Sequence, residues 1–262
     1  TARLSGPLPR AWQQGQAMQL DAVHADMESF AAADSVDALT ALCRDKARAL
    51  GFDSFVYALR VPTDFADARL IMIDGYPPGW VSHYMGEAFY DIDPVMKYCA
   101  DHVIPLQWSD IAVAPGDTGH RVMNEAAAFG LRAGISMPIH SPQGEFGVLS
   151  FALDAASPHA SDVTRHALPR IQLLAAYLHE AVRRVSGLGQ GVQGRTLTER
   201  ERECLRWAAD GKTSSEIAQI LNMAESTANF HLRNAMLKLD VSNRQHAVAK
   251  AALQGLIHPR PF

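Results

Sequence analysis

The chain has 262 residues, of which 48 % are hydrophobic and 20 % are charged, and its formal net charge is −4. This length favours two domains, and this composition favours a packed core over disorder. No apolar run reaches about 18 residues, which argues against a membrane span.

The charge is unevenly distributed along the chain. From Arg195 to Phe262 there are ten Lys or Arg against seven Asp or Glu, a balance of +3, which leaves −7 for residues 1–194. An acidic body with a mildly basic C-terminal part suggests that only this part meets an anionic partner.

The cysteines and the first residues indicate the compartment. Cys43, Cys99 and Cys204 are far apart and odd in number, so they predict neither a disulfide framework nor a metal site. Residues 1–10 do not resemble a secretory signal. We therefore expect a cytoplasmic protein with buried, inert thiols.

The N-terminal part alternates predicted helices and strands. In chain order we expect helices over 17–30 and 35–50, strands over 55–59 and 70–73, helices over 78–85, 94–99 and 120–129, strands over 135–139 and 146–153, and a helix over 161–185. Helices before, between and after the strands, with one hairpin, indicate an α/β (α+β) domain. It would be an α/β/α sandwich with an antiparallel sheet, which can leave an apolar slot for a small ligand.

A glycine-rich segment divides the chain. Four glycines lie within eight positions after Ser186, which costs too much backbone entropy for a helix or a strand. We therefore expect a ligand-binding and dimerisation domain over 1–185, a linker over 186–195 and a second domain over 196–262.

The second domain is predicted to be all-helical. We expect helices over 199–209, 216–221 and 225–239. Thr198 and Glu201 fit a capping box at the start of the first helix, and Ser214 or Ser215 can cap the second. A short helix, a three-residue turn and a longer helix form a helix-turn-helix, whose second helix can enter the major groove of DNA.

The longer helix has one apolar face and one polar face. The apolar stripe consists of Ala228, Leu232, Ala235, Met236 and Leu239. Asn and Arg on the polar face suit base edges, whereas groups at element ends suit phosphates. The candidate DNA-binding residues are Lys212, Thr213 and Arg244 at element ends, and Ser226, Thr227, Asn229, Phe230, Arg233, Asn234 and Lys238 on the helix. A protein-binding bundle with a solvated polar face is the alternative.

The C-terminal domain also carries a series of short motifs. They are Leu197-Thr-Glu-Arg-Glu201, Leu205, Asp210-Gly-Lys-Thr213, Glu216-Ile-Ala218, Glu225-Ser-Thr227, His231 and Lys238-Leu239. This series resembles the DNA-binding domain of LuxR-type regulators over nearly all of residues 196–257. One departure is Ala228, where Val is usual, and the smaller side chain should cost a little stability.

Large side chains with polar tips gather between residues 76 and 108. Trp80 offers an N–H donor, Tyr76 a hydroxyl and Asp93 an acceptor, which together could hold a carbonyl and an amide N–H of a small amphipathic ligand. The rings of Tyr84 and Trp108 would enclose a cyclic group.

Each of these residues also has a purely structural explanation. Asp93 directly before Pro94 is a good helix cap, and Trp80 and Trp108 could be ordinary core aromatics. Tyr76, which precedes a proline, could be a turn residue. The pattern of a phospho-receiver domain, with clustered acidic residues at strand ends, is not evident in this part of the sequence.

Taken together, the spacing of these residues is informative. The series Tyr76, Trp80, Tyr84, Asp93-Pro94, Trp108 and Gly134 resembles the autoinducer-binding domain of acyl-homoserine-lactone receptors, over about residues 50–151. The resemblance implies an N-acyl homoserine lactone as regulatory ligand and no other cofactor. It implies that Trp80 binds the lactone carbonyl, that Asp93 binds the amide N–H, and that Tyr76 and Ser150 bind the acyl carbonyl. The expected acyl-chain wall is Val56, Ala58, Val95, Met96 and Val148.

These expectations combine into one hypothesis. The chain would be a ligand-dependent transcription factor that binds an inverted-repeat promoter site as a homodimer, with RNA polymerase as a further partner and no membrane. Dimerisation would use the front domain and the helix over 161–185. One alternative is a regulator that answers a different small molecule or a protein partner. Another is a hydrolase using Ser136, Ser150, His140 and Asp93, against which the absence of a G-x-S-x-G motif argues.

Overall fold

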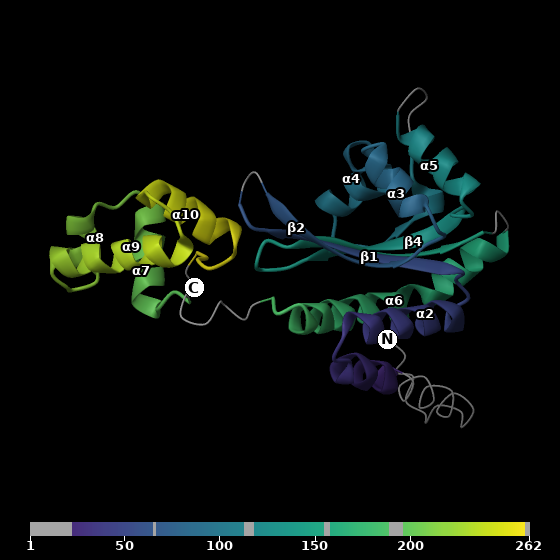
Figure 1. Cartoon of the computed structure of the whole chain (residues 1–262), viewed down its shortest axis with the longest axis horizontal. Coiled ribbons are helices and arrows are strands. Elements are labelled where there is room, and N and C mark those ends of the chain that lie inside the picture. Colours follow the sequence, from purple (N-terminus) through teal and green to yellow (C-terminus); the bar gives the residue numbers. More distant parts are fainter. Residues whose placement is uncertain (1–22, 65–66, 113–117, 155–157, 189–195, 260–262) are drawn as a thin grey trace, which may run out of the picture.

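The computed structural model describes residues 23–64, 67–112, 118–154, 158–188 and 196–259. Figure 1 shows two groups of elements: a sheet between two layers of helices, and a cluster of four helices formed by the C-terminal part. Of the expected helix over 17–30, residues 23–30 belong to a helix that continues to residue 32, and the rest lies outside the described residues, as do residues 189–195 of the expected linker. No described helix is both long and apolar enough to cross a bilayer.

Five strands form one antiparallel sheet in the order β2-β1-β5-β4-β3. They are β1 (Ser54–Pro62), β2 (Ala68–Gly75), β3 (Leu106–Gln107), β4 (Ala133–His140) and β5 (Phe146–Leu153). Side chains alternate between the two faces, so Tyr57 and Leu59 point to one side of β1 while Val56 and Ala58 point to the other.

Helices cover both faces of this sheet, which confirms the expected α/β/α sandwich (Figure 1). One layer contains α2 (Val36–Ala49) and α6 (Pro158–Val185), and the other contains α3 (Trp80–Gly86), α4 (Pro94–Asp101) and α5 (Gly119–Ala128), with the 3-10 turns η1 (Phe89–Asp91) and η2 (Trp108–Asp110). The main core lies under α2 and α6, where Phe30, Leu39, Tyr57, Leu149 and Ile171 are fully buried. A pocket lies between the sheet and the opposite layer.

Local sequence signals mark both ends of α2. The Ser35 hydroxyl accepts a hydrogen bond from the Ala38 backbone N–H at 3.3 Å and caps the helix. The chain leaves the helix through Gly51, whose φ of +87° is easily adopted by glycine alone. The three cysteines are buried, and burial raises the pKa of both Cys43 and Cys99 to about 12, as expected for inert thiols.

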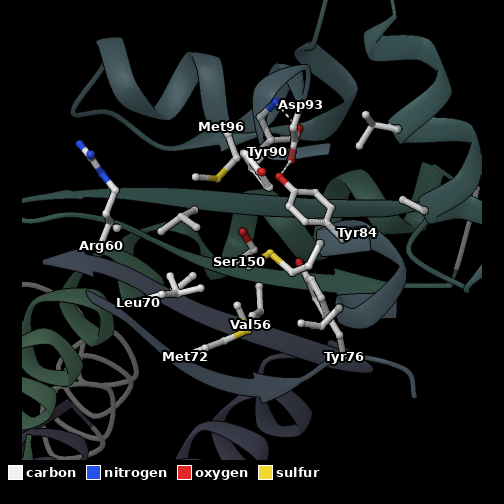
Figure 2. Close-up of a pocket in the computed structure, with 18 of the residues that line it drawn as sticks. Val56, Arg60, Leu70, Met72, Tyr76, Tyr84, Tyr90, Asp93, Met96 and Ser150 are labelled. Carbon is white, nitrogen blue, oxygen red and sulfur yellow. Dashed lines mark hydrogen bonds between the residues drawn. The ribbon is translucent and has the colours of Figure 1, made fainter. Parts of the chain in front are cut away.

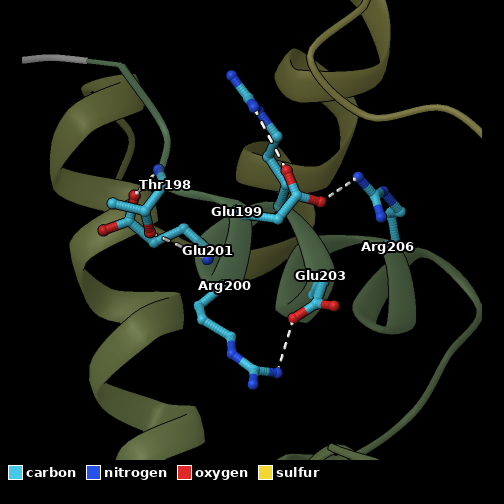
Figure 3. A network of polar contacts seen from close by, with 7 residues as sticks. Thr198, Glu199, Arg200, Glu201, Glu203 and Arg206 are labelled. Carbon is cyan, nitrogen blue, oxygen red and sulfur yellow. Dashed lines mark hydrogen bonds and ion pairs between the residues drawn. The ribbon is translucent and has the colours of Figure 1, made fainter.

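The C-terminal helices pack around a second core. They are α7 (Glu199–Ala209), α8 (Ser214–Ile220), α9 (Glu225–Leu239) and α10 (Arg244–Leu253). The expected capping box is present, since the Thr198 N–H donates to the Glu201 carboxylate at 2.7 Å and the Glu201 N–H donates to the Thr198 hydroxyl (Figure 3).

The start of α8 differs from the expectation. Neither Ser214 nor Ser215 is the cap, because both lie inside the helix. Thr213 is the cap instead, and its hydroxyl and backbone N–H form a second capping box with Glu216. The reciprocal Thr-x-x-Glu bonding satisfies two backbone donors, which a serine one position later could not do with the same Glu.

Sequence patterns did not predict α10. Asn243 caps this helix by accepting a hydrogen bond from the His246 N–H at 2.8 Å, and Ala247 and Ala251 are fully buried against the other three helices. A capping Asn followed by apolar residues one turn apart was the available signal.

The two groups of elements meet at the β1–β2 hairpin. The Gln254 side-chain amide donates to the Thr63 carbonyl at 2.9 Å. The Asp64 carboxylate faces His246 at 3.7 Å and Lys250 at 3.6 Å. The β1–β2 hairpin therefore lies against α10.

Candidate ligand pocket and nucleic-acid interface

A pocket of about 880 Å³ lies between the sheet and the layer formed by α3, α4 and α5. All residues expected to bind a ligand line it: Val56, Ala58, Tyr76, Trp80, Tyr84, Asp93, Val95, Met96, Trp108, Val148 and Ser150. They come from the strands β1 and β5, the helices α3 and α4 with the Asp93 cap, the turn η2 and the residue after β2. The fold therefore brings together residues up to about a hundred positions apart in the chain. A volume of this size is ample for a small organic ligand.

Asp93 is both a helix cap and a wall of this pocket. One carboxylate oxygen accepts a hydrogen bond from the Val95 N–H at 2.8 Å and the other accepts one from the Tyr84 hydroxyl at 2.8 Å (Figure 2). Burial raises the pKa of the Asp93 carboxyl, although both hydrogen bonds act in the opposite direction. The helix-cap explanation is therefore correct, and it leaves the carboxylate facing the pocket.

A second polar group lies on the sheet side of the pocket. The Trp108 indole N–H donates to the Ser136 hydroxyl at 2.9 Å, and the Ser136 and Ser150 hydroxyls are 2.7 Å apart. Tyr76 hydrogen-bonds to Ser150, and burial raises the pKa of the Tyr76 phenol. Sequence reasoning gave Ser136 no ligand-binding role, and the register of β4 and β5 in the structure places it directly opposite Ser150.

Gly134 is required by the position of the Trp108 ring. A Cβ atom at Gly134 would lie 2.9 Å from the indole and 2.6 Å from the Phe151 carbonyl oxygen. Only glycine lets the indole lie across β4 at this distance, which gives a physical reason for a glycine in the series noted above.

Trp80 presents an N–H donor at the same end of the pocket. Its side chain is buried among aromatic rings, with ring centroids 5.8 Å from Tyr84 and 5.3 Å from Phe129. Within the described part of the chain, its indole N–H has no hydrogen-bond partner. The residue is thus part of a small core, as the alternative explanation held, and also a donor available to a ligand.

An ionic network fixes the helix that carries Trp80 and Tyr84. His83 on α3 contacts the Glu125 carboxylate of α5 at 2.5 Å, and Arg121 contacts the same carboxylate at 2.7 Å. The hydrogen bond with His83, together with that from Arg121, lowers the pKa of Glu125. The network therefore holds α3 against α5.

The rest of the pocket is mostly apolar. Figure 2 shows Arg60 and Leu70 at one end of it and Tyr76 and Tyr84 at the other. The walls that sequence reasoning missed include Arg60, Leu70, Met72, Val81, Met85, Tyr90, Val122, Met123, Ala126, Leu131 and Phe146. Strand alternation could have identified Leu70 and Met72, but the helix contributions depend on how α3 and α5 pack over the sheet.

His140 does not belong to this pocket. Its Nε2 hydrogen-bonds to the backbone carbonyls of Cys99 and His102, at 2.9 and 3.1 Å. The four residues of the hydrolase alternative therefore do not form one constellation.

The face of α9 that was expected to read DNA is exposed. Ser226, Thr227, Asn229, Phe230 and Arg233 are exposed, whereas the stripe on the opposite side packs into the second core. Phe230 is 60 % exposed, which is unusual for a phenylalanine in an isolated domain. Asn234 is half-buried at the edge of this face.

Four other candidate DNA-binding residues take part in hydrogen bonds within the C-terminal helices. They are Lys212, Thr213, Lys238 and Arg244. The Lys238 ammonium donates to the buried Glu201 carboxylate at 2.8 Å and to the Thr196 carbonyl. The Arg244 guanidinium donates to the carbonyl of Lys212, and the Thr213 hydroxyl is engaged in its capping box. Burial opposes ionisation of Glu201, yet Lys238 and the Thr198 N–H lower its pKa overall.

The arginines of α7 also form ion pairs with glutamates of the same helix. Arg206 contacts Glu199, and Arg200 contacts Glu203, at 2.9 Å each (Figure 3). The net positive charge of the domain is thus partly compensated along α7, away from the exposed face of α9.

Two family models match the chain. The model described as an autoinducer binding domain matches residues 35–182, and the model described as bacterial regulatory proteins of the luxR family matches residues 195–251. The chain is 35 % identical to the transcriptional activator protein VanR of Vibrio anguillarum, over 80 % of this chain and 87 % of that protein.

Two solved structures are similar to this chain over most of its length. The structure of Escherichia coli SdiA matches with a TM-score of 0.76 and 29 % identity, over 92 % of this chain and 99 % of that one. A second structure, SdiA in complex with octanoyl-rac-glycerol, matches with the same TM-score and identity and covers 98 % of that chain.

Proposed function

The chain belongs to the LuxR family of bacterial regulatory proteins, and from this premise we propose that it is a transcription factor controlled by an N-acyl homoserine lactone. The lactone would bind in the domain over 1–185, and the domain over 196–262 would bind DNA. The observation that carries the proposal is the pocket between the sheet and the α3–α5 layer, which has polar groups at one end and apolar walls along the rest. The chain is a regulator and not an enzyme, in keeping with its relatives.

The polar end of the pocket complements the head of such a ligand. A lactone carbonyl needs a donor, which the Trp80 indole offers, and an amide N–H needs an acceptor, which Asp93 offers with lone pairs left after its two hydrogen bonds. The acyl carbonyl would accept hydrogen bonds from Tyr76 and Ser150. Ser136, which lies 2.7 Å from Ser150, would orient that hydroxyl.

The apolar walls explain why binding would change the protein. An acyl chain that fills the space beside Val56, Val95 and Val148 replaces an uncompensated cavity with packed contacts. A ligand at 100 times its Kd adds about 2.7 kcal/mol to the free energy of unfolding. That is a large fraction of the total of about 5–15 kcal/mol that a typical domain has.

The C-terminal domain would read DNA with the exposed face of α9. Asn229 and Arg233 suit base edges, and Lys212 suits a phosphate. A homodimer formed through the front domain and α6 would set two such helices against a palindromic promoter site with half-sites about one turn apart. The protein would act in the cytoplasm, with RNA polymerase as a further partner.

A second candidate function is a LuxR-type regulator that answers a different small molecule. The observation that favours it is the SdiA structure in complex with octanoyl-rac-glycerol, because that ligand has an acyl chain and no lactone ring. The two candidates differ at the polar end of the pocket, where a lactone uses the Trp80 donor.

The test compares the Trp80→Phe variant with the wild-type chain. Loss of one hydrogen bond should raise the Kd for N-decanoyl homoserine lactone about two- to tenfold, the equivalent of about 0.5–1.5 kcal/mol. The Kd is measured from the lactone-dependent shift in the unfolding midpoint. Trp207→Phe, in the second core, makes the same change away from the pocket and should leave the Kd unaltered. Equal Kd values for wild-type and Trp80→Phe protein would show that the indole does not hold the lactone.

A further inference from the structure

The apolar part of the pocket is built as successive levels along the sheet. Alternate residues of β1 that face the pocket are Val56, Ala58 and Arg60, and the strand register sets each beside partners on β5 and β2. The first level pairs Val56 with Ser150, at the polar end. The middle level contains Ala58, Met72 and Val148, and the far level contains Arg60, Leu70 and Phe146.

The distance between the first and the far level can be estimated from strand geometry. Val56 and Arg60 are four steps apart along β1, which at about 3.3 Å per residue is about 13 Å. An extended hydrocarbon chain advances about 1.25 Å per carbon, given bonds of about 1.52 Å at tetrahedral angles. A chain that starts at Ser150 therefore needs about ten carbons to reach the far level.

The volume of the pocket is also larger than a short lactone needs. At roughly 30 Å³ per packed non-hydrogen atom, a butanoyl homoserine lactone of about 12 such atoms takes about 360 Å³, and a dodecanoyl one of about 20 takes about 600 Å³. The pocket measures about 880 Å³, so the short ligand fills less than half of it. The longer ligand fills about two thirds of the pocket and covers the apolar side chains of the middle and far levels.

Two features set the limits of this channel. Ala58 is the small residue of the middle level, and its short side chain leaves the passage between Val148 and the α4 residue Met96 open. At the far level the side chain of Arg60 is exposed, so its hydrocarbon stem covers the chain end while the guanidinium stays in water.

We propose that the pocket selects acyl chains of about ten to twelve carbons, with Ala58 as the residue that admits them past the middle level. This inference rests on the proposed function and defines the class of ligand more narrowly. A chain of six carbons or fewer would end before the middle level or at it, and would leave the apolar surface of Leu70 and Phe146 uncovered.

The test measures the Kd of the full-length chain for N-butanoyl, N-hexanoyl, N-decanoyl and N-dodecanoyl homoserine lactones. Each fully buried methylene can multiply the affinity about fourfold. The dodecanoyl lactone should therefore bind at least about 30-fold more tightly than the hexanoyl lactone. Ala58→Leu should weaken dodecanoyl binding at least about tenfold and change hexanoyl binding by less than about threefold, since the added side chain fills the passage beyond the sixth carbon.

Controls separate this inference from the proposed function. Ala128→Leu makes the same change at an exposed position of α5 outside the pocket and should leave both Kd values unaltered. Retained hexanoyl binding by Ala58→Leu shows that this variant is folded. Equal wild-type affinity for hexanoyl and dodecanoyl lactones, or equal loss of both in Ala58→Leu, overturns the chain-length inference alone. If no lactone of any length binds, the proposed function fails as well.

Discussion

At the scale of single residues, Asp93 shows how one side chain serves structure and binding together. It caps α4, accepts a hydrogen bond from the Tyr84 hydroxyl, and lines the pocket. Its burial is costly, because a carboxylate with few polar neighbours favours the protonated form. Under the proposed function, Asp93 accepts the amide N–H of the ligand, which would justify keeping this acceptor despite its cost to stability.

The raised pKa of Asp93 makes a prediction about stability and pH. Because the pKa is higher in the folded than in the unfolded chain, the wild type loses stability as pH rises from the unfolded value of about 3.9 up to the folded value. Asp93→Asn keeps a good capping residue and removes the charge. The free energy of unfolding of the variant should therefore rise relative to that of the wild type across this range, by about 1.4 kcal/mol for each unit by which the pKa of Asp93 is raised. Urea unfolding between pH 4 and pH 8 measures the difference. A difference that stays constant or shrinks with rising pH would contradict this account of Asp93.

At the scale of elements, α9 divides its surface between two tasks. Ala228, Leu232 and Ala235 pack into the second core, while Asn229 and Arg233 on the other side are exposed. The helix is held at its last turn by Lys238, whose ammonium pairs with the buried carboxylate of α7. The face that we propose to bind DNA therefore belongs to a helix that is held in place at its last turn.

This division predicts the effect of substitutions on DNA binding. Arg233→Ala should lose about 1–3 kcal/mol, or about 5- to 150-fold in affinity, for DNA selected from a random pool with the wild-type protein and lactone. Arg200→Ala removes an arginine that pairs with Glu203 on α7, and it should change the affinity by no more than about twofold. Gel-shift titration gives both affinities. Unaltered affinity in Arg233→Ala would remove this residue from the base-reading set.

Elements with strong local patterns were predictable from the sequence. The capped helix α2, the β4–β5 hairpin and α9 each carry their own periodicity and end signals, so neighbouring residues suffice to identify them. The helix α10 was missed because its buried positions are only alanines, which give a weak apolar signal.

Contacts between distant residues were not predictable in the same way. Lys238 on the helix and Arg244 at an element end were both expected to bind DNA, yet their partners within the protein lie 37 and 32 residues away in the chain. No local pattern records such a pairing. The pocket residues expected from the family spacing did converge, whereas Met85, Tyr90 and Val122 became walls only through the packing of the helical layer.

At the scale of the whole molecule, the two domains touch through the hairpin that also lines the pocket. Asp64 at the tip of the β1–β2 hairpin faces Lys250 of α10, and Arg60 and Leu70 further along the same hairpin line the far end of the pocket. The ligand-binding end of the structure and the DNA-binding domain are therefore joined by one continuous pair of strands (Figure 1).

The most direct test of the account is calorimetric titration of the full-length chain with N-decanoyl homoserine lactone at several temperatures. Enclosure of an acyl chain by apolar walls predicts saturable binding of one lactone per chain with a clearly negative heat-capacity change. Absence of saturable heat at every temperature, or binding with no heat-capacity change, would contradict the claim that the lactone is enclosed in this pocket.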